Sequence, residues 1–221
     1  MNDPYNLSMP LVNEDSDFAE LAVLNADGLV GISEDLNPEL VLSAYASGAF
    51  PWYKFLKVYW WHSPDPRMVL FPEQLKVSKS MRQVIRKECF KVTANQAFEA
   101  VMDKCAKVPR REQEGTWITP EFKQVYSELH EKGFAQSIEV WQDDLLVGGL
   151  YGIKLGDNFF GESMFSEESN ASKRAFIALA QGELLDRPKI IDCQVYTNHL
   201  SSMGAALIER AEFLKIIKAQ G

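Results

Sequence analysis

A carboxylate and an amide stand two residues apart in an apolar run near the C-terminal end of the sequence, residues 190–195 (IIDCQV). Side chains of a β-strand point alternately to its two faces, so Ile191 and Cys193 are expected to face the core. Asp192 and Gln194 then share the opposite face. Polar groups are costly to bury without partners, so this pair is either a strand end that its neighbours satisfy or part of a catalytic site.

A second carboxylate lies between two large apolar residues of another predicted strand. Glu162 alternates with Phe160 and Met164, so the three side chains should share one strand face. This pattern is typical of a pocket that is apolar in its body and charged at one point. The alternative is a structural salt bridge from Glu162 to Lys173 or Arg174.

Aromatic residues gather in segments that are expected to form loops. Residues 114–119 (EGTWIT) lead into a predicted helix, and such a loop can hold the Trp117 indole over a cleft, although a lone tryptophan is more often part of a core. Trp52 lies in a dense aromatic and proline segment, residues 50–67. The prolines of that segment argue against a continuous helix or a central strand.

Positive charge is concentrated locally in a chain whose formal net charge is −8. An acidic balance alone argues against nucleic-acid binding, because phosphate neutralisation needs cations. Residues 76–87 nevertheless carry several cations and no acid, and this segment is a candidate surface for RNA. The alternative is a solvated helix face. The cations are Lys76, Lys79, Arg82, Arg86 and Lys87.

Bulk composition indicates a globular protein. The chain has 221 residues, 46% of them hydrophobic, which suits one ordinary domain or one domain with a small satellite. Its apolar stretches are shorter than the roughly 18 residues of a membrane span, and the N-terminus lacks the pattern of a signal peptide. Three cysteines without metal-like spacing fit a reducing compartment. We therefore expect a cytoplasmic protein.

The chain divides near Pro66. The first 65 or so residues are turn-rich, with one clear helix that Asn37 should cap and Gly48 should end. Beyond Pro66 the pattern alternates between short apolar strands and amphipathic helices. We expect a small N-terminal domain over residues 1–66 and a larger domain over residues 67–221.

Three strands in succession define the larger domain. Residues 136–141, 145–153 and 158–165 are joined by short turns, which predicts an antiparallel meander. A helix over residues 172–185 and a strand over 189–195 follow. This order resembles the acyltransferase fold of N-acetyltransferases, so the predicted class is α+β, with a mixed sheet.

Ordered sequence blocks make the chain similar to the leucyl/phenylalanyl-tRNA–protein transferase family. A single block would mean little, but the blocks follow one another in the family's order from about Asp35 to Val195. In sequence they are Asp35-Leu36-Asn37-Pro38, Gly48-Ala49-Phe50-Pro51-Trp52, Trp60-Trp61-His62-Ser63-Pro64-Asp65-Pro66-Arg67, Glu114-Gly115-Thr116-Trp117-Ile118-Thr119, His130-Glu131-Lys132-Gly133, Ser137-Ile138-Glu139-Val140-Trp141, Gly161-Glu162-Ser163-Met164-Phe165-Ser166, Asn170-Ala171-Ser172-Lys173 and Asp192-Cys193-Gln194-Val195.

This resemblance implies an activity and its partners. Enzymes of the family take Leu or Phe, and Met less well, from aminoacyl-tRNA and join it to the α-amine of proteins that begin with Arg or Lys. The product is marked for N-degron proteolysis. The resemblance implies no ATP, metal or other cofactor, because the tRNA ester already stores the activation. We expect a monomer that binds no membrane.

The resemblance also implies roles for individual residues. Trp52 and Trp117 should hold the 3′-terminal adenosine, Glu162 an amino group, and Met164 the apolar side chain of the donor. Asp192 and Gln194 should lie at the reacting ester. An α-amine has a pKa of about 7.7–8.0, and our hypothesis from the sequence is that Asp192 orients that amine and takes its proton. The Gln194 amide would support the developing oxyanion.

Two positions depart from the family pattern, and two other functions remain open. Thr197 stands where some members have Asn, and Ser33-Glu34 where typical members have Gly-Gly, while His199 matches a family histidine that we interpret as structural. An acetyl-CoA-dependent N-acetyltransferase would need a glycine-rich pyrophosphate loop at a helix N-terminus, whereas Val147-Gly148-Gly149 lies inside a predicted strand. A non-catalytic module for tRNA or N-terminal peptides would not need both Asp192 and Gln194.

Overall fold

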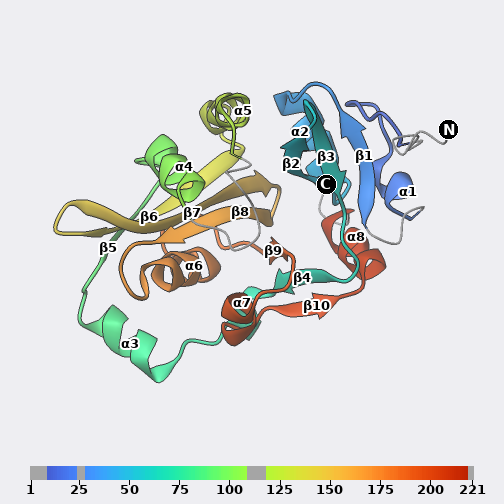
Figure 1. Ribbon diagram of the computed structural model, residues 1–221. Helices are drawn as coiled ribbons and strands as arrows, with labels where there is room; N and C mark the ends of the chain where they lie inside the picture. Colours follow the sequence, from blue (N-terminus) through green and yellow to red (C-terminus); the bar gives the residue numbers. More distant parts are fainter. Residues whose placement is uncertain (1–8, 24–27, 109–117, 219–221) are drawn as a thin grey trace.

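The computed structural model describes residues 9–23, 28–108 and 118–218, and in these it places two β-sheets and the helices around them (Figure 1). The helices are α1 (Phe18–Val23), α2 (Pro38–Ala46), α3 (Lys79–Arg86), α4 (Phe98–Ala106), α5 (Pro120–Glu131), α6 (Ala171–Gln181), α7 (Asn198–Ser202) and α8 (Arg210–Lys218), with a 3-10 turn at Pro72–Gln74. No helix in these ranges is long and apolar enough to cross a bilayer.

A small antiparallel sheet occupies the N-terminal part of the chain. Its order is β1-β3-β2, with β1 at Leu29–Ser33, β3 at Val58–His62 and β2 at Phe50–Phe55. The expectation that this region lacks a central strand was wrong, because β3 lies between the other two. Pro51 stands in β2, an edge strand, where a missing N–H is tolerated.

The larger sheet has the order β10-β4-β9-β8-β7-β6-β5. All its neighbours are antiparallel except β8 and β9, which run parallel, so the sheet is mixed. The strands are β4 (Arg67–Leu70), β5 (Lys91–Ala94), β6 (Ala135–Gln142), β7 (Leu145–Leu155), β8 (Asn158–Ser166), β9 (Ile190–Gln194) and β10 (Ala206–Ile208).

The predicted meander is confirmed in β6, β7 and β8. Asp143 and Asp144 join the first two strands with φ values of 49° and 64°, the left-handed pair that a two-residue hairpin turn requires. Helix α6 and the parallel strand β9 follow as expected. The α+β class and the acyltransferase-like order of elements are therefore confirmed by the topology.

Side chains cap the starts of two helices, and the cap that was predicted at Asn37 is confirmed. The Asn37 side chain accepts a hydrogen bond from the Leu40 N–H at 2.8 Å at the start of α2, and Thr119 caps α5 through the Phe122 N–H. Such caps satisfy backbone donors that a helix start leaves free. In α3, Met81 is buried, whereas Val84 and Ile85 are half-buried.

Two hydrophobic clusters lie on the two faces of the larger sheet. One face packs against α6, where Gly148 allows close approach because a Cβ there would lie 2.5 Å from the Ala171 Cβ. The other face packs against α4 and α5. That second cluster continues into the N-terminal sheet and α8, and it includes Trp61 and Phe213. The division at Pro66 therefore separates two sheets that share a core, and it stays a prediction as a domain boundary.

Candidate active site

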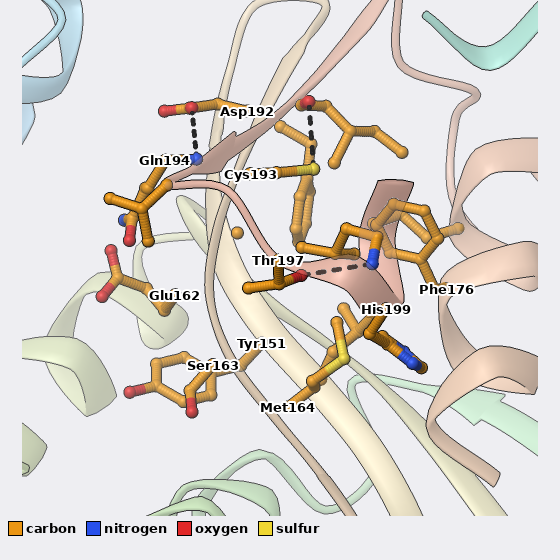
Figure 2. A pocket seen from close by; sticks show the side chains of 17 residues that line it. Tyr151, Glu162, Ser163, Met164, Phe176, Asp192, Cys193, Gln194, Thr197 and His199 are labelled. Atoms are coloured by element: carbon orange, nitrogen blue, oxygen red, sulfur yellow. Dashed lines mark hydrogen bonds between the residues drawn. The ribbon is translucent and has the colours of Figure 1, made fainter. Parts of the chain in front are cut away.

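A pocket forms where the parallel strands β8 and β9 separate. Their paired register runs from Asn158 opposite Ile190 to Phe160 opposite Asp192. Beyond this point β8 continues along β7, whereas β9 ends at Gln194. A cavity of about 330 Å³ lies at the divergence, with α6 and α7 closing its sides (Figure 2). The divergence exposes one face of each strand to the cavity.

The body of this pocket is apolar, and its polar groups are few. Side chains of β7, β8, β9, α6 and α7 line it, and polar atoms stand mainly where β8 and β9 part. The apolar lining includes Leu150, Phe159, Met164, Phe176, Leu179, Ile191 and Leu200. The polar lining includes Glu162, Ser163, Asp192, Gln194, Thr197 and His199. Such a lining is typical of a small-molecule site that fixes its ligand through a few polar groups.

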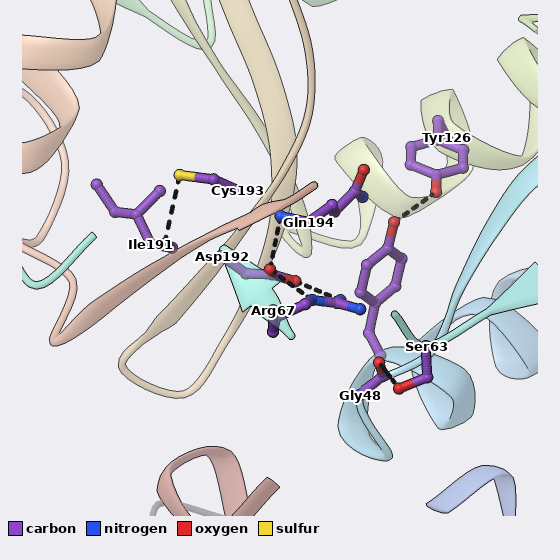
Figure 3. A network of polar contacts seen from close by, with 9 residues as sticks. Gly48, Ser63, Arg67, Tyr126, Ile191, Asp192, Cys193 and Gln194 are labelled. Atoms are coloured by element: carbon purple, nitrogen blue, oxygen red, sulfur yellow. Dashed lines mark hydrogen bonds and ion pairs between the residues drawn. The ribbon is translucent and has the colours of Figure 1, made fainter. Parts of the chain in front are cut away.

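Asp192 is held by a buried arginine from a distant strand. Arg67 Nε donates to Asp192 Oδ1 at 2.8 Å and Nη2 donates to Oδ2 at 2.6 Å, and the two side chains are 0% and 1% exposed (Figure 3). The guanidinium carbon lies 4.8 Å from each of two ring centroids, those of Phe50 and Phe213. A bidentate pair of this kind fixes geometry as well as charge.

The chain turns sharply immediately after Asp192. Gln194 has a φ of 62°, and its backbone N–H donates to Asp192 Oδ1 at 2.9 Å. The Val195 N–H then donates to the Cys193 carbonyl at 2.8 Å. A left-handed conformation is uncommon for a residue other than glycine and needs local support. The Asp192 carboxylate supplies that support, so it shapes the strand end as well as lining the pocket.

Glu162 has a different environment from Asp192. Its Oε1 is sealed from solvent, and it has no hydrogen-bond partner in the part of the chain that the structure describes. The predicted alternative, a salt bridge to Lys173 or Arg174, does not occur, because Arg174 pairs with Glu183. Burial raises the pKa of the Glu162 carboxyl well above its usual range, and the negative charge of Asp192 raises it further.

The Gln194 side chain lines the same pocket as this carboxylate. Figure 2 shows the two side-chain ends pointing to the same end of the cavity. Gln194 Nε2 is buried and, among the described residues, has no hydrogen-bond partner. An unpartnered acceptor on Glu162 and an unpartnered donor on Gln194 therefore belong to one cavity, and buried polar atoms without partners call for an explanation.

Two further polar residues line the pocket from the segment that enters α7. Thr197 Oγ1 accepts from the Leu200 N–H at 3.2 Å, so this hydroxyl also caps α7. His199 is half-buried, and burial followed by the charge of Lys173 lowers its pKa, which keeps the ring neutral at pH 7. We interpreted His199 as structural from the sequence, but the structure places it on the pocket wall with Nε2 unpartnered within the described ranges.

The remaining predicted residues lie elsewhere. Trp52 is on β2, its ring centroid 4.8 Å from that of His62, and it does not line the pocket. Trp117 falls outside the described residues, so its role stays a prediction. The predicted RNA-binding cations are all exposed, on α3 and the residues that flank it. They are Lys76, Lys79, Arg82, Arg86 and Lys87.

Sequence reasoning missed the contribution of Arg67. The signal was available, because β4 (Arg67–Leu70) is buried along its whole length and begins with a permanent charge. A charge in such a strand needs a buried counter-ion. The sequence did not show which carboxylate that would be, since Asp192 lies 125 residues further on.

An apolar pocket with an acid and an amide at one end, built on an acyltransferase-like sheet, defines the chain as an acyl-group transferase. A nucleotide pyrophosphate loop is excluded at Gly148-Gly149, because both residues lie within β7 and pack against other chain segments. A model of the leucyl/phenylalanyl-tRNA protein transferase matches residues 69–218, and a model of the N-terminal domain of that transferase matches residues 34–65. The chain belongs to the leucyl/phenylalanyl-tRNA–protein transferase family, and it is an aminoacyltransferase.

Relatives in this family are similar over most of the chain. The leucyl/phenylalanyl-tRNA–protein transferase of Christiangramia forsetii is 51% identical over 95% of this chain and 100% of its own. That of Flavobacterium johnsoniae is 50% identical over 92% of this chain and 96% of its own. Among solved structures, FemX matches with a TM-score of 0.46 and 11% identity, over 90% of this chain and 76% of its own. That likeness is too weak to bear on activity.

Proposed function

We propose that the pocket between β8 and β9 receives the aminoacyl end of Leu- or Phe-tRNA and passes the amino acid to the α-amine of a protein that begins with Arg or Lys. The main support is that one cavity combines an apolar lining with the unpartnered polar atoms of Glu162 and Gln194. The apolar body is suited to a Leu or Phe side chain, and the polar end to an ester and an amine.

The polar end of the pocket is suited to aminolysis of an ester. Gln194 Nε2 is a free donor that can support the oxyanion that develops when the ester carbonyl is attacked. The Glu162 carboxyl is the acidic group of this end, because the charge of Asp192 is balanced by Arg67, and an acidic group here favours a cationic acceptor such as an N-terminal Arg or Lys. Orientation of the two reactants contributes much of such a rate enhancement, and the ester itself supplies the driving force.

We propose that the cationic segment Lys76–Lys87 extends the site toward the body of the tRNA. The Lys76 N–H donates to the Met203 carbonyl at 2.8 Å, directly after α7, whose residues line the pocket. From there the exposed cations continue along α3. We propose that this surface binds tRNA phosphates, while Trp52 and Trp117 stack on the terminal adenosine, an interaction worth about 1–3 kcal/mol per base.

A salt titration tests the tRNA surface. Lys79→Gln/Arg82→Gln/Arg86→Gln should raise the KM for the charged tRNA and lower the slope of log kcat/KM against log salt by about 0.7 for each lost phosphate contact. A matched control removes three exposed cations elsewhere, in Lys57→Gln/Lys215→Gln/Lys218→Gln. An equal loss in both triple variants would contradict a specific surface on α3.

The division into residues 1–66 and 67–221, the monomeric state and the cytoplasmic location belong to the same proposal. The two family models support the division, since they match residues 34–65 and 69–218. The location is supported by relatives named for a tRNA substrate.

A transfer assay tests the proposed function. The purified protein is incubated with Leu-tRNA and a peptide that begins with Arg, and the peptide is weighed by mass spectrometry. We expect a gain of one Leu residue at the N-terminus, little gain on a peptide that begins with Asp, and no acetylation when acetyl-CoA replaces the tRNA. No transfer from Leu-, Phe- or Met-tRNA would overturn the proposal and favour a binding module.

A further inference from the structure

We propose that Glu162, rather than Asp192, accepts the proton of the attacking α-amine, and that Arg67 and Asp192 together act as positioning residues for Gln194. This inference rests on the proposed function and assigns separate roles to the residues of that site. It reverses the roles that the sequence alone suggested for the two carboxylates.

Both oxygens of the Asp192 carboxylate already have hydrogen-bond partners. Its Oδ1 accepts from Arg67 Nε at 2.8 Å and from the Gln194 N–H at 2.9 Å, and its Oδ2 accepts from Arg67 Nη2 at 2.6 Å. A proton on this carboxyl would weaken the bidentate pair and leave the Arg67 charge, which is 0% exposed, without its counter-ion. A base that must release its own bonds to react is poorly suited to proton transfer.

Glu162, in contrast, has a carboxylate oxygen that is available to a substrate in the pocket. Its Oε1 is buried and has no partner in the described residues, and its side chain lines the same cavity as Gln194. Figure 2 shows the carboxylate pointing to the end of the pocket where the Gln194 amide lies. A carboxylate with a sealed, unpartnered oxygen binds a proton more strongly than a fully solvated one, and this matches it better to an amine.

A series of contacts from Arg67 through Asp192 positions Gln194. Arg67 fixes Asp192, Asp192 holds the Gln194 backbone in its left-handed conformation, and Gln194 thereby presents Nε2 to the cavity. The Arg67 guanidinium is itself packed between Phe50 of β2 and Phe213 of α8. Residues from the N-terminal and the C-terminal parts of the chain thus help to position the amide that would contact the ester.

The resulting reaction balances without a co-reactant. The acceptor nitrogen attacks the ester carbonyl carbon and gives its proton to the Glu162 carboxylate. The new C–N bond remains when the C–O bond to the tRNA ribose breaks. The ribose oxygen then takes the proton from Glu162, which returns to its ionised form. The products are the extended protein and the free 3′ end of the tRNA.

Other titratable groups line the same cavity, and the test must separate them from Glu162. They are Tyr151 on β7, Asp192 and Cys193 on β9, and His199 on α7. The acceptor amine also titrates, but its contribution is common to every variant. We therefore compare pH profiles of kcat under saturating substrates for the parent, Glu162→Gln, Asp192→Asn and His199→Gln.

The parent profile should rise on its acid side with a slope of about 2, from the amine and one carboxyl group. In Glu162→Gln the slope should fall to about 1 and kcat by about 100- to 10,000-fold, the usual range for a lost general base. The profiles of Asp192→Asn and His199→Gln should keep the parental shape. In Glu162→Ala, formate should restore part of kcat, and Arg67→Lys should lower kcat while the KM for the donor stays unchanged.

An acid limb in Glu162→Gln identical to that of the parent overturns the proposal, whatever formate does. The proposal is also overturned if the acid limb changes in Asp192→Asn and not in Glu162→Gln, because that result would make Asp192 the base. Circular dichroism and thermal unfolding identify variants that fail to fold, and in that case the comparison uses Glu162→Ala with and without formate. If the parent protein transfers no amino acid, the proposed function itself is wrong. If the parent is active and Glu162→Gln keeps the parental acid limb, only the assignment of Glu162 as the base is wrong.

Discussion

Two glutamates on strands of the same sheet, each with a carboxylate oxygen shielded from solvent, have opposite environments. Glu139 on β6 is 0% exposed and accepts hydrogen bonds from Thr93 Oγ1 and Ser137 Oγ, both at 2.5 Å, and from the Ala97 N–H at 3.4 Å. Glu162 on β8 keeps a sealed oxygen for which the described residues offer no partner. A satisfied buried acid stabilises a fold, whereas an unsatisfied one is a cost that a ligand or a reaction can explain.

The positions of the two residues explain the difference. Glu139 lies between β5 and the start of α4, where its carboxylate joins an edge strand to a helix. The Trp141 indole extends the network by donating to Thr93 Oγ1 at 2.8 Å. Glu162 lies where β8 and β9 part, so the neighbouring strand supplies no group to meet it. We infer that Glu139 serves stability and Glu162 serves the reaction.

Matched substitutions at the two glutamates give the largest expected contrast. Glu162→Gln should lower kcat by about 100-fold or more, while Glu139→Gln should leave kcat per folded molecule unchanged because its carboxylate touches no pocket residue. Single-turnover transfer assays on both variants measure this contrast. Comparable losses of kcat in the two variants would break the distinction between them.

Removing the donors around Glu139 tests the stabilising side of the comparison. Thr93→Val/Ser137→Ala takes away both side-chain hydroxyls that meet the carboxylate. An unsatisfied buried polar group costs about 1–3 kcal/mol, and more when it is charged, so the free energy of unfolding should fall by at least about 2 kcal/mol. Urea denaturation measures the change. A double variant as stable as the parent would show that this network contributes nothing.

The smallest expected effect is the pH dependence of the stability that Glu162 contributes. The pKa of Glu162 is raised in the folded state from an unfolded value near 4.5, so the unfolded chain loses this proton first as the pH rises. The stability that Glu162 contributes is therefore complete below about pH 4.5 and is lost as the pH rises through its folded pKa.

Glu162→Gln lacks this titration and should gain stability relative to the parent as the pH rises above about 4.5. Thermal unfolding at a series of pH values measures the difference between the two proteins. A constant difference across this range would mean that the folded carboxyl does not carry the raised pKa.

Elements with a local signal were predictable from the sequence. Asn37 and Thr119 cap helices through their own side chains, and the paired aspartates Asp143-Asp144 form the hairpin of the meander. Strand alternation also placed Ile190 and Ile191 correctly, since they join the hydrophobic clusters of opposite faces. In each case a few neighbouring residues decide the conformation.

Features that depend on distant partners were not predictable. The central strand β3 (Val58–His62) is stabilised by pairing with β1 and β2, which overrides the weak local pattern of a proline-rich region. The sequence suggested Asp192 as the base because it did not show that Arg67 would occupy it. Glu162, Met164, Asp192, Gln194 and Thr197 line one pocket, and their roles there stay a prediction. Which of their atoms already have hydrogen-bond partners depends on distant residues, so the sequence could not show it.

A crystal structure with a stable analogue of the donor, 3′-leucylamido-3′-deoxyadenosine, is the most direct test of the account. We expect the leucyl side chain against Met164 and Leu179, the amide carbonyl within hydrogen-bond reach of Gln194 Nε2, and Glu162 Oε1 free to meet the acceptor amine. The Arg67–Asp192 pair should remain intact. An analogue bound outside the β8–β9 pocket, or one whose amino group breaks the Arg67–Asp192 pair to contact Asp192, would contradict the account.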